Sequence, residues 1–409
     1  MHQLVAVVGY FVILGLGVAL SRDRKAIRPR VIVWGVLAQW VLALLLLKVP
    51  GGNEVLQGAS AVVSGVLSHS FAGSGFVYGE LGKMGGGATG LGIIFAFQVL
   101  PTILFVATLF GVLYYLGVMQ LIVRVMARVM VRLFGVSGAE ALAVAASVFM
   151  GQSEAPLTIR PYLAKLTDSE LFCVVVAGMA SVSGAILGAY VMIGGVQMEH
   201  LLTAVAMTAP ISLVMAKVIV PETQTPVTAG VVASAPVDAS VNVLDAAANG
   251  ASDGLKLAVN VGAMLIAFIA LVSLINAALG LLTLGGESLT LQRILGWLCA
   301  PLALAMGIPW DEAQAVGSIL GTRTVVNEIV AYQELATMKA TLAPRSVAIA
   351  TFAVCGFANL GSIGIQIGGL GALVPERKSD IARMGVLALV AATLANFTSA
   401  CVAGALLSP

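Results

Sequence analysis

Eight apolar runs, each close to the length of a membrane-spanning helix, dominate this 409-residue sequence. A helix needs about 20 apolar residues to cross the hydrocarbon core of a bilayer, because each residue advances it by only ~1.5 Å. Charged residues make up 10% of the chain, against about a quarter in a soluble domain, so the sequence predicts an all-α protein embedded in a lipid bilayer. The expected spans are residues 4–20, 31–48, 91–118, 171–195, 201–220, 257–283, 346–370 and 384–407.

Composition and motifs exclude several other classes of protein. The net charge is +2 and the basic residues lie at the ends of the apolar runs, so no nucleic-acid partner is expected. The four cysteines form no CxxC pair and the three histidines are dispersed, which argues against a disulfide framework or a zinc site. The sequence contains no HExxH, no GxSxG and no helical Asp pair, so we expect no enzyme activity and no organic cofactor.

The distribution of basic residues predicts how the chain is oriented. The loop 21–30 holds five cations and one aspartate, and by the positive-inside rule it is cytoplasmic. Counting spans from this loop places Arg124, Arg128 and Arg132 inside, where their spacing makes one basic stripe on a helix along the inner interface. The cluster within 376–383, at the start of the last span, also falls inside. Residues 51–90 are expected to form an outer interfacial segment without a full span.

Three pairs of short segments match in the same order in two parts of the chain. The matched pairs are GVSGAEALAV (135–144) with GIPWDEAQAV (307–316), Glu154 in GQSEAP with Glu328 in VVNEIV, and GMAS (178–181) with GFAN (356–359). The offsets are 172 (307 − 135), 174 (328 − 154) and 178 (356 − 178) residues, so only short insertions separate them. These matches predict an internal repeat.

The two Glu-bearing segments read as re-entrant hairpins. Residues 137–166 begin and end on the cytoplasmic side, whereas 309–341 begin and end outside. Each is interrupted by polar residues and is too short for two crossings. Opposed repeats with broken helices are typical of a secondary transporter whose site lies near the middle of the membrane. The predicted fold is therefore about eight transmembrane helices plus two opposed hairpins in inverted repeats.

Placing a carboxylate at a hairpin tip inside the membrane has an unfavourable free energy, so a carboxylate found there suggests a function. Placing one in a membrane costs at least about 2.5–3.5 kcal/mol on insertion scales, which makes Glu154 and Glu328 candidates for substrate binding. The alternatives are structural, with Glu154 capping its own hairpin beside Arg160, and Glu328 paired with Arg323.

Other polar residues in the broken segments also have two interpretations. Ser181 and Asn359 lie in Gly-rich stretches, where they either pack helices together or coordinate a ligand at an unwound segment. Phe357 either packs or lines a pocket for a planar ring. Gln152 and Ser153 carry amide and hydroxyl groups that suit the edge of a nucleobase.

Four motifs resemble the concentrative nucleoside transporter family. The motifs are GQSEAPLTIRPYL (151–163), GMASVSGAILGAYV (178–191), NEIVAY (327–332) and GFANLGSIGI (356–365), and the resemblance covers essentially the whole chain. It implies that the first hairpin faces the base, through Gln152, Ser153 and Glu154. It implies that the second hairpin and seventh helix face the ribose, through Glu328, Asn359 and Ser362, with Phe357 beside both.

The resemblance also implies the activity and its setting. It implies a secondary active symporter that imports a nucleoside such as uridine or adenosine across the bacterial inner membrane by alternating access. Members are typically homotrimers in which a transport domain moves like an elevator against a fixed scaffold. A transporter of another small polar solute, or a channel, is the alternative function, and the preference for purines or pyrimidines is left open.

The coupling ion is the point at which this chain departs from the family. Sodium-coupled members commonly have Asn five residues before the hairpin Gln, where this chain has Ser147. A Na⁺ site would combine Ser147 and Ser181 with the backbone carbonyls of Met150 and Val182. Proton-coupled relatives often have Ser there, so Na⁺ and H⁺ both stay open. Glu154 and Glu328 are then the titratable candidates.

The expected domain organisation follows from the spans and the repeats. Its parts are the N-terminal scaffold helices 1–118, a cytoplasmic interfacial helix 119–136, the first repeat 137–220, a cytoplasmic linker 221–254, a scaffold span with an outer interfacial segment 255–306, and the second repeat 307–409.

Overall fold

The computed structural model describes residues 1–231, 240–284 and 286–408, and nearly all of them are helical. The helices up to the middle of the chain are α1 His2–Ala19, α2 Pro29–Leu47, α3 Pro50–Ser68, α4 Ser70–Tyr78, α5 Leu100–Tyr115, α6 Val118–Phe134, α7 Gly138–Ser147, α8 Asp168–Ala180, α9 Gly184–Gly194 and α10 Met198–Ile219. The later helices are α11 Val243–Leu279, α12 Leu291–Ala305, α13 Trp310–Val325, α14 Glu328–Met338, α15 Pro344–Val354, α16 Leu360–Leu373 and α17 Lys378–Leu406.

The remaining elements are short. The 3-10 and π turns are Arg24–Ala26, Gly79–Gly82, Met84–Thr89, Phe95–Val99, Ala155–Lys165 and Pro375–Arg377. Strands β1 Thr283–Leu284 and β2 Glu287–Ser288 pair antiparallel, with Thr283 opposite Ser288. This small hairpin connects α11 to α12.

Eight helical stretches of the described residues are long and apolar enough to cross a membrane, which confirms the expected number. The segments that form these eight stretches differ from the predicted spans at two places. The run 346–370 is broken into α15 and α16, because the backbone leaves the helical path at Gly356–Asn359. The sequence predicts no full span within 51–90, but the helical stretch 54–89 is long and apolar enough to cross a membrane, because Val, Leu and Ala offset the Gly and Ser of α3 and α4.

The two repeats correspond element by element. In the first, α7 and the 3-10 helix Ala155–Lys165 form a hairpin, the pair α8 and α9 forms a broken helix, and α10 follows. In the second, α13 and α14 form the hairpin, α15 and α16 the broken helix, and α17 the last helix. The internal repeat predicted from three short matches therefore extends over whole supersecondary units.

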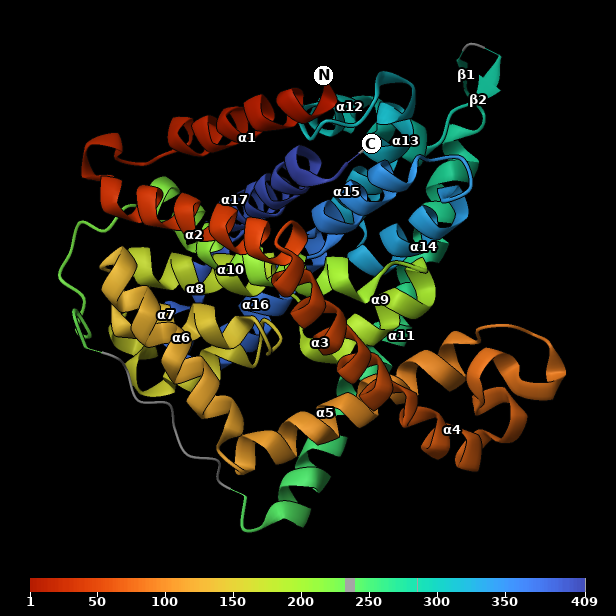
Figure 1. Ribbon diagram of the computed structural model, residues 1–409, viewed down its shortest axis with the longest axis horizontal. Coiled ribbons are helices and arrows are strands. Elements are labelled where there is room, and N and C mark those ends of the chain that lie inside the picture. Colours follow the sequence, from red (N-terminus) through yellow and green to blue (C-terminus); the bar gives the residue numbers. More distant parts are fainter. Residues whose placement is uncertain (232–239, 285, 409) are drawn as a thin grey trace.

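The repeats make the centre of the molecule (Figure 1), where α17 packs against α8, α10, α15 and α16. The most apolar stretch of 168–194 is 94% buried, whereas that of α11 is 6% buried. Helix α1 packs along α17, and α2 packs along α10. Helices α5 and α11 pack along each other at the edge of this core, where α5 also contacts α9. The site is therefore built in the repeats, with α5 and α11 beside it.

Helix α6 has the surface expected of an interfacial helix. Its buried side is apolar, whereas Arg124, Arg128 and Arg132 lie on its exposed side. Arg30, from the basic loop, donates hydrogen bonds to the carbonyls of Arg132 (2.5 Å) and Leu133 (2.9 Å) near the C-terminal end of this helix. A cation there interacts favourably with the helix dipole.

The stretch expected as a linker ends earlier in the structure. Helix α11 begins at Val243, and Asn242 caps it by accepting a hydrogen bond from the backbone N–H of Asp245 at 2.9 Å. Two of the aspartates that suggested a linker up to 254, Asp245 and Asp253, thus belong to the first turns of a long helix. Residues 232–239 of that stretch lie outside the described residues.

Candidate substrate and cation site

Both hairpins break where the sequence places polar residues. Helix α7 begins with a capping box between Ser137 and Glu140, and the chain resumes as a 3-10 helix at Ala155. In the second hairpin, the side chain of Asn327 caps α14 by accepting a hydrogen bond from the N–H of Val330 at 2.9 Å. Backbone that is broken at membrane depth needs such partners, because lipid supplies none.

The two broken helices meet at their breaks. Ser183 caps α9 and Asn359 caps α16, each through its side-chain oxygen. Between these caps, the N–H of Phe357 donates a hydrogen bond of 3.1 Å to the carbonyl of Ser181. The two unwound segments are therefore in direct contact, although 176 residues (357 − 181) separate them in the sequence.

Glu328 is held by two donors from different elements. Its Oε1 accepts a hydrogen bond from the hydroxyl of Tyr190 at 3.1 Å, and its Oε2 accepts one from Nδ2 of Asn359 at 3.0 Å. The carboxylate is buried, as is Tyr190, which stacks on Tyr332 with ring centroids 4.6 Å apart. Tyr190 is not among the site residues predicted from the sequence, although a tyrosine in the apolar run GAILGAYV is a polar group at membrane depth.

A chain of hydrogen bonds joins Glu328 to the first hairpin. Asn359 Oδ1 accepts from the N–H of Ser362 (2.9 Å), and Ser362 Oγ accepts from Nε2 of Gln152 (3.1 Å). Oε1 of Gln152 in turn accepts a long hydrogen bond of 3.5 Å from Nε2 of Gln366, a second residue that is not predicted from the sequence. Four of the expected site residues therefore lie in one network that crosses both hairpins.

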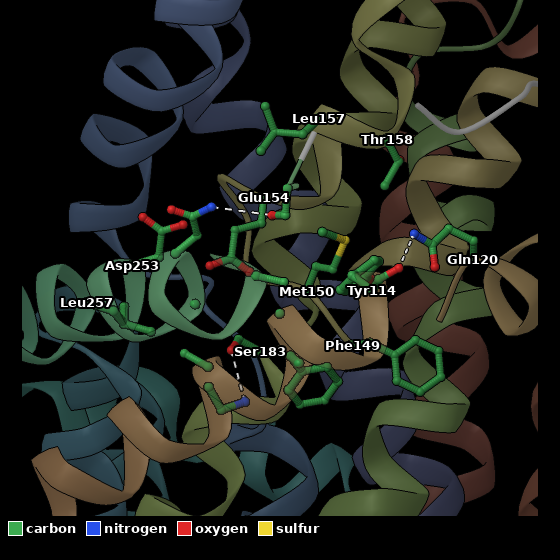
Figure 2. Close-up of a pocket in the computed structure, with 18 residues that line it drawn as sticks. Tyr114, Gln120, Phe149, Met150, Glu154, Leu157, Thr158, Ser183, Asp253 and Leu257 are labelled. Atoms are coloured by element: carbon green, nitrogen blue, oxygen red, sulfur yellow. Dashed lines mark hydrogen bonds between the residues drawn. The ribbon is translucent and has the colours of Figure 1, made fainter. Parts of the chain in front are cut away.

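Ser153 and Glu154 lie apart from Gln152. Ser153 is exposed beside α16, where a Cβ added at Gly369 would lie 3.0 Å from its hydroxyl. Glu154 accepts a hydrogen bond from the N–H of Gly151 at 3.0 Å, so it does cap its own hairpin, as the structural alternative proposed. Its carboxylate points into a cavity on the side of α5 and α11 (Figure 2).

This cavity has a volume of about 450 Å³ and lies between the first hairpin and helices α5, α6, α9 and α11. Figure 2 shows Glu154 of the first hairpin and Asp253 of α11 near each other in its lining. Tyr114, Gln120 and Asn249 add polar groups to the lining. Cavities of about 300–1,000 Å³ accommodate small organic ligands, so the space is large enough for a nucleoside.

Two of the residues expected to bind a cation, Ser147 and Ser181, are in contact at the first break. The hydroxyls of Ser147 and Ser181 lie 3.2 Å apart, and the N–H of Gly184 fixes the hairpin to α9 by donating to the carbonyl of Phe149 at 2.9 Å. Within the described part of the chain, the carbonyls of Met150 and Val182 accept no hydrogen bond. Hydroxyl and carbonyl oxygens are the ligands that hard cations prefer.

The two ion pairs weighed as structural alternatives are not found among the described residues. Glu154 makes none with Arg160, and Glu328 makes none with Arg323. Arg323 is instead fully buried and donates to Thr393 and Asn396 of α17.

Two hairpins, two broken helices and a shared polar network in an all-helical membrane protein define a secondary active transporter. The structure agrees closely with transporters of known structure. An inward-facing, substrate-bound form of CNTnw matches with a TM-score of 0.91 at 43% identity over 99% of this chain and 98% of that one. An outward-facing form of a CNTnw variant matches with a TM-score of 0.93 at 42% identity over the same shares.

Sequence comparisons match nucleoside transporters along nearly the whole chain. Family models described as Na⁺-dependent nucleoside transporter N-terminus and C-terminus match residues 8–81 and 200–404, and one described as nucleoside recognition matches 96–197. The nucleoside permease NupC of Helicobacter pylori is 41% identical over 98% of this chain and 97% of its own length. Human solute carrier family 28 member 3 is 37% identical over all of this chain and 60% of its own.

The chain belongs to the concentrative, Na⁺-dependent nucleoside transporter family. The predicted family, the helical membrane fold and the transporter function are thereby confirmed, and the protein is a transporter, not an enzyme. Relatives solved in inward- and outward-facing states indicate alternating access.

Proposed function

We propose that this protein imports nucleosides together with Na⁺, and that the network from Gln152 to Glu328 is the nucleoside site. The observation that carries the proposal is the continuous set of hydrogen bonds from Gln152 through Ser362 and Asn359 to Glu328. It is buried, it involves both hairpins, and it offers the donors and acceptors that a polar substrate can take over. An unpaired polar group there would be costly, so the network stays paired until a ligand replaces its bonds.

The two ends of the network suit the two parts of a nucleoside. A carboxylate beside an amide suits vicinal ribose hydroxyls, which supports Glu328 and Asn359 as ribose ligands. The amide of Gln152 suits the edge of a base, with Ser362 between the two and Phe357 at the second break. Ser153 and Glu154 lie on other sides of the hairpin turn, so their access to the base would require the turn to rearrange around the ligand.

The 450 Å³ cavity supports an access route on the cytoplasmic side. Its lining includes Tyr114 and Gln120, which flank the junction of α5 with the interfacial helix α6, and Asn249 in the first turns of α11. The positive-inside count places these helix ends in the cytoplasm. Glu154 would then face the cytoplasm, and the repeats would move against α5 and α11 in an elevator-like cycle.

The exposed apolar surface supports a proposal about assembly in a membrane. Helix α11 carries exposed Ile266 and Leu274, and only a small part of it is buried within one chain. Lipid or further copies of the chain would cover such a surface, and we propose a homotrimer in the bacterial inner membrane with α11 at its interface. We propose uridine and adenosine as test substrates, without a preference between them.

Uptake by proteoliposomes tests the proposed function directly. Labelled uridine and adenosine should accumulate when a Na⁺ gradient is imposed at equal pH on both sides. A pH gradient without Na⁺ should give no accumulation above that of empty liposomes. Accumulation driven by the pH gradient alone would instead identify a proton symporter, and equilibration without accumulation would identify a channel.

Replacing Ser147 by Asn is expected to strengthen Na⁺ dependence. The substitution adds a side-chain carbonyl oxygen where Ser147 and Ser181 lie 3.2 Å apart, so the Na⁺ concentration for half-maximal uptake should fall about 3- to 10-fold. Nucleoside affinity without Na⁺ serves as the control and should change little. Unaltered Na⁺ dependence in matched liposomes would place Ser147 outside the cation site.

Tyr190→Phe is expected to weaken nucleoside affinity by about 10- to 150-fold. It removes the hydroxyl that holds Oε1 of Glu328, and a hydrogen bond to a charged group contributes about 1.5–3 kcal/mol. Tyr332→Phe is the matched control, because Tyr332 stacks on Tyr190 but donates its hydrogen bond to the carbonyl of Thr351 at 3.0 Å. Calorimetry on purified protein should separate the two variants, and equal affinities would leave Tyr190 a purely structural role.

A further inference from the structure

One side chain of α17 binds both broken helices at once. Nδ2 of Asn396 donates a hydrogen bond of 2.8 Å to the carbonyl of Ala180, the last residue of α8. The same nitrogen donates one of 3.0 Å to the carbonyl of Cys355, which follows the last residue of α15. Asn396 is fully buried. It therefore satisfies two helix-end carbonyls that lipid could not satisfy.

Arg323 of the second hairpin sets the orientation of this amide. Its guanidinium donates to Oδ1 of Asn396, and also to Oγ1 of Thr393 at 3.0 Å. A guanidinium has donors only, so the amide oxygen must face Arg323 and the amide nitrogen must face the two carbonyls. Arg323 thus fixes Asn396 in the orientation that links the two breaks.

The backbone around Asn396 is shaped to allow this contact. A Cβ added at Gly356 would lie 2.4 Å from Oδ1 of Asn396 and 2.7 Å from the carbonyl of Ala180. No side chain fits there, so only glycine permits the approach. The hydrogen bond from Phe357 to Ser181 then joins the two breaks directly, beside the link through Asn396.

The two linked segments carry different ligands under the proposed function, on which this inference rests. The first break carries Ser181 and Val182, the proposed Na⁺ ligands, and the second carries Phe357 and Asn359, the proposed nucleoside ligands. We propose that Asn396, oriented by Arg323, is a positioning residue that couples the two sites. A cation that orders the first break thereby orders the second, and a nucleoside does the reverse.

The coupling factor between the two ligands tests this inference. It is the ratio of the nucleoside dissociation constants of the purified protein without Na⁺ and with saturating Na⁺. Coupled sites commonly show factors of about 5–150, and linkage requires the nucleoside to change Na⁺ affinity by the same factor. Asn396→Asp keeps the shape and the contact with Arg323 but removes the donor. The factor should fall at least about 5-fold in both measurements.

Ser399→Ala is the matched control. Ser399 lies three residues further along α17, is also buried, and bonds to Gln39 (3.1 Å) and Thr208 (3.2 Å) of α2 and α10, away from both breaks. It should retain the parental coupling factor. A loss of stability without a change in the factor for Asn396→Asp, or an equal change in both variants, would overturn the inference.

Two further measurements keep the inference testable if Asn396→Asp does not fold. Arg323→Lys retains the charge but not the geometry that orients the amide, so its coupling factor should also fall. In the unmodified protein, Na⁺ alone should slow hydrogen exchange at the amides of 357–362. If Arg323→Lys keeps the coupling factor of the parent, or if Na⁺ has no effect on those amides, the inference is contradicted.

The outcomes for the parent and the variants can be told apart. A parent protein without Na⁺–nucleoside coupling would overturn the proposed Na⁺ symport as well, whereas unchanged coupling factors in the variants alone would overturn only the role of Asn396.

Discussion

Replacing Glu328 by Gln is expected to abolish nucleoside uptake. The carboxylate accepts from Tyr190 on one oxygen and from Asn359 on the other. An amide of the same shape would direct an NH₂ group toward one of these two donors and would lose the charge-assisted hydrogen bonds available to ribose hydroxyls. Uptake of labelled uridine by proteoliposomes should fall by at least about 100-fold, which corresponds to about 2.7 kcal/mol.

Glu334→Gln is the matched control for this prediction. Glu334 lies six residues further along α14 and accepts a hydrogen bond from Ser318, away from the polar network. It should retain near-parental uptake. Inhibition of labelled uridine uptake by unlabelled compounds provides an independent check. If Glu328 recognises the ribose, unlabelled uracil should inhibit this uptake much more weakly than unlabelled uridine. Parental uptake by Glu328→Gln, or equal competition by the free base, would contradict the assignment.

The broken helices and hairpins could be predicted because their signal is local. A Glu, Gln or Asn within an apolar run is costly unless the backbone around it also breaks from the helix and shares its polar partners. Glu154, Glu328 and Asn359 could therefore be recognised one segment at a time. The repeat then placed them in corresponding elements, and the structure has hairpins and breaks at these places.

The partners of these residues could not be predicted in the same way. Tyr190 lies within one of the four family motifs, but no motif specifies the partners of Tyr190, Arg323 and Asn396. The hydrogen bonds that these side chains make join residues between 41 and 216 positions apart. Which side of a helix meets which neighbour depends on the packing of seventeen helices in the described chain, and hydropathy alone does not define it. Asn396 illustrates this limit of prediction, because in the sequence it cannot be distinguished from a small polar residue that only packs helices together.

The turn of the first hairpin shows a second limit. Gln152, Ser153 and Glu154 are consecutive, and the family resemblance implies that all three face the base. In the structure the chain turns tightly before the 3-10 helix at Ala155, so Gln152 reaches α16 whereas Glu154 reaches the cavity beside α11. Adjacent residues in a tight turn point in different directions, and the motif does not specify those directions.

A buried ionic cluster holds the inner end of the first repeat together. Nζ of Lys217 lies 2.5 Å from Oε2 of Glu140 and 3.2 Å from Oε2 of Glu222, and it donates to Ser169 at 3.0 Å. A third carboxylate, Glu170, joins the cluster by accepting from Ser137 at 2.5 Å. All three carboxylates are buried, and within this set Lys217 is the one cation. It therefore connects α7, α8 and α10 at a point where acids outnumber bases.

Lys217→Met is expected to destabilise the protein severely. The side chain keeps about the same length, but Glu140 and Glu222 lose their counter-charge, and breaking a buried ion pair costs about 3–5 kcal/mol. The measurement is the temperature at which half of the protein in detergent loses its monodisperse form on heating. This temperature should be several degrees lower for Lys217→Met than for the parent.

Lys83→Met is the control, because the Lys83–Glu80 pair is exposed and should contribute little to stability. Adding Glu140→Gln to Lys217→Met should restore part of the loss, since it removes one uncompensated charge. A Lys217→Met protein as heat-resistant as the parent would show that the carboxylates are stabilised without the lysine.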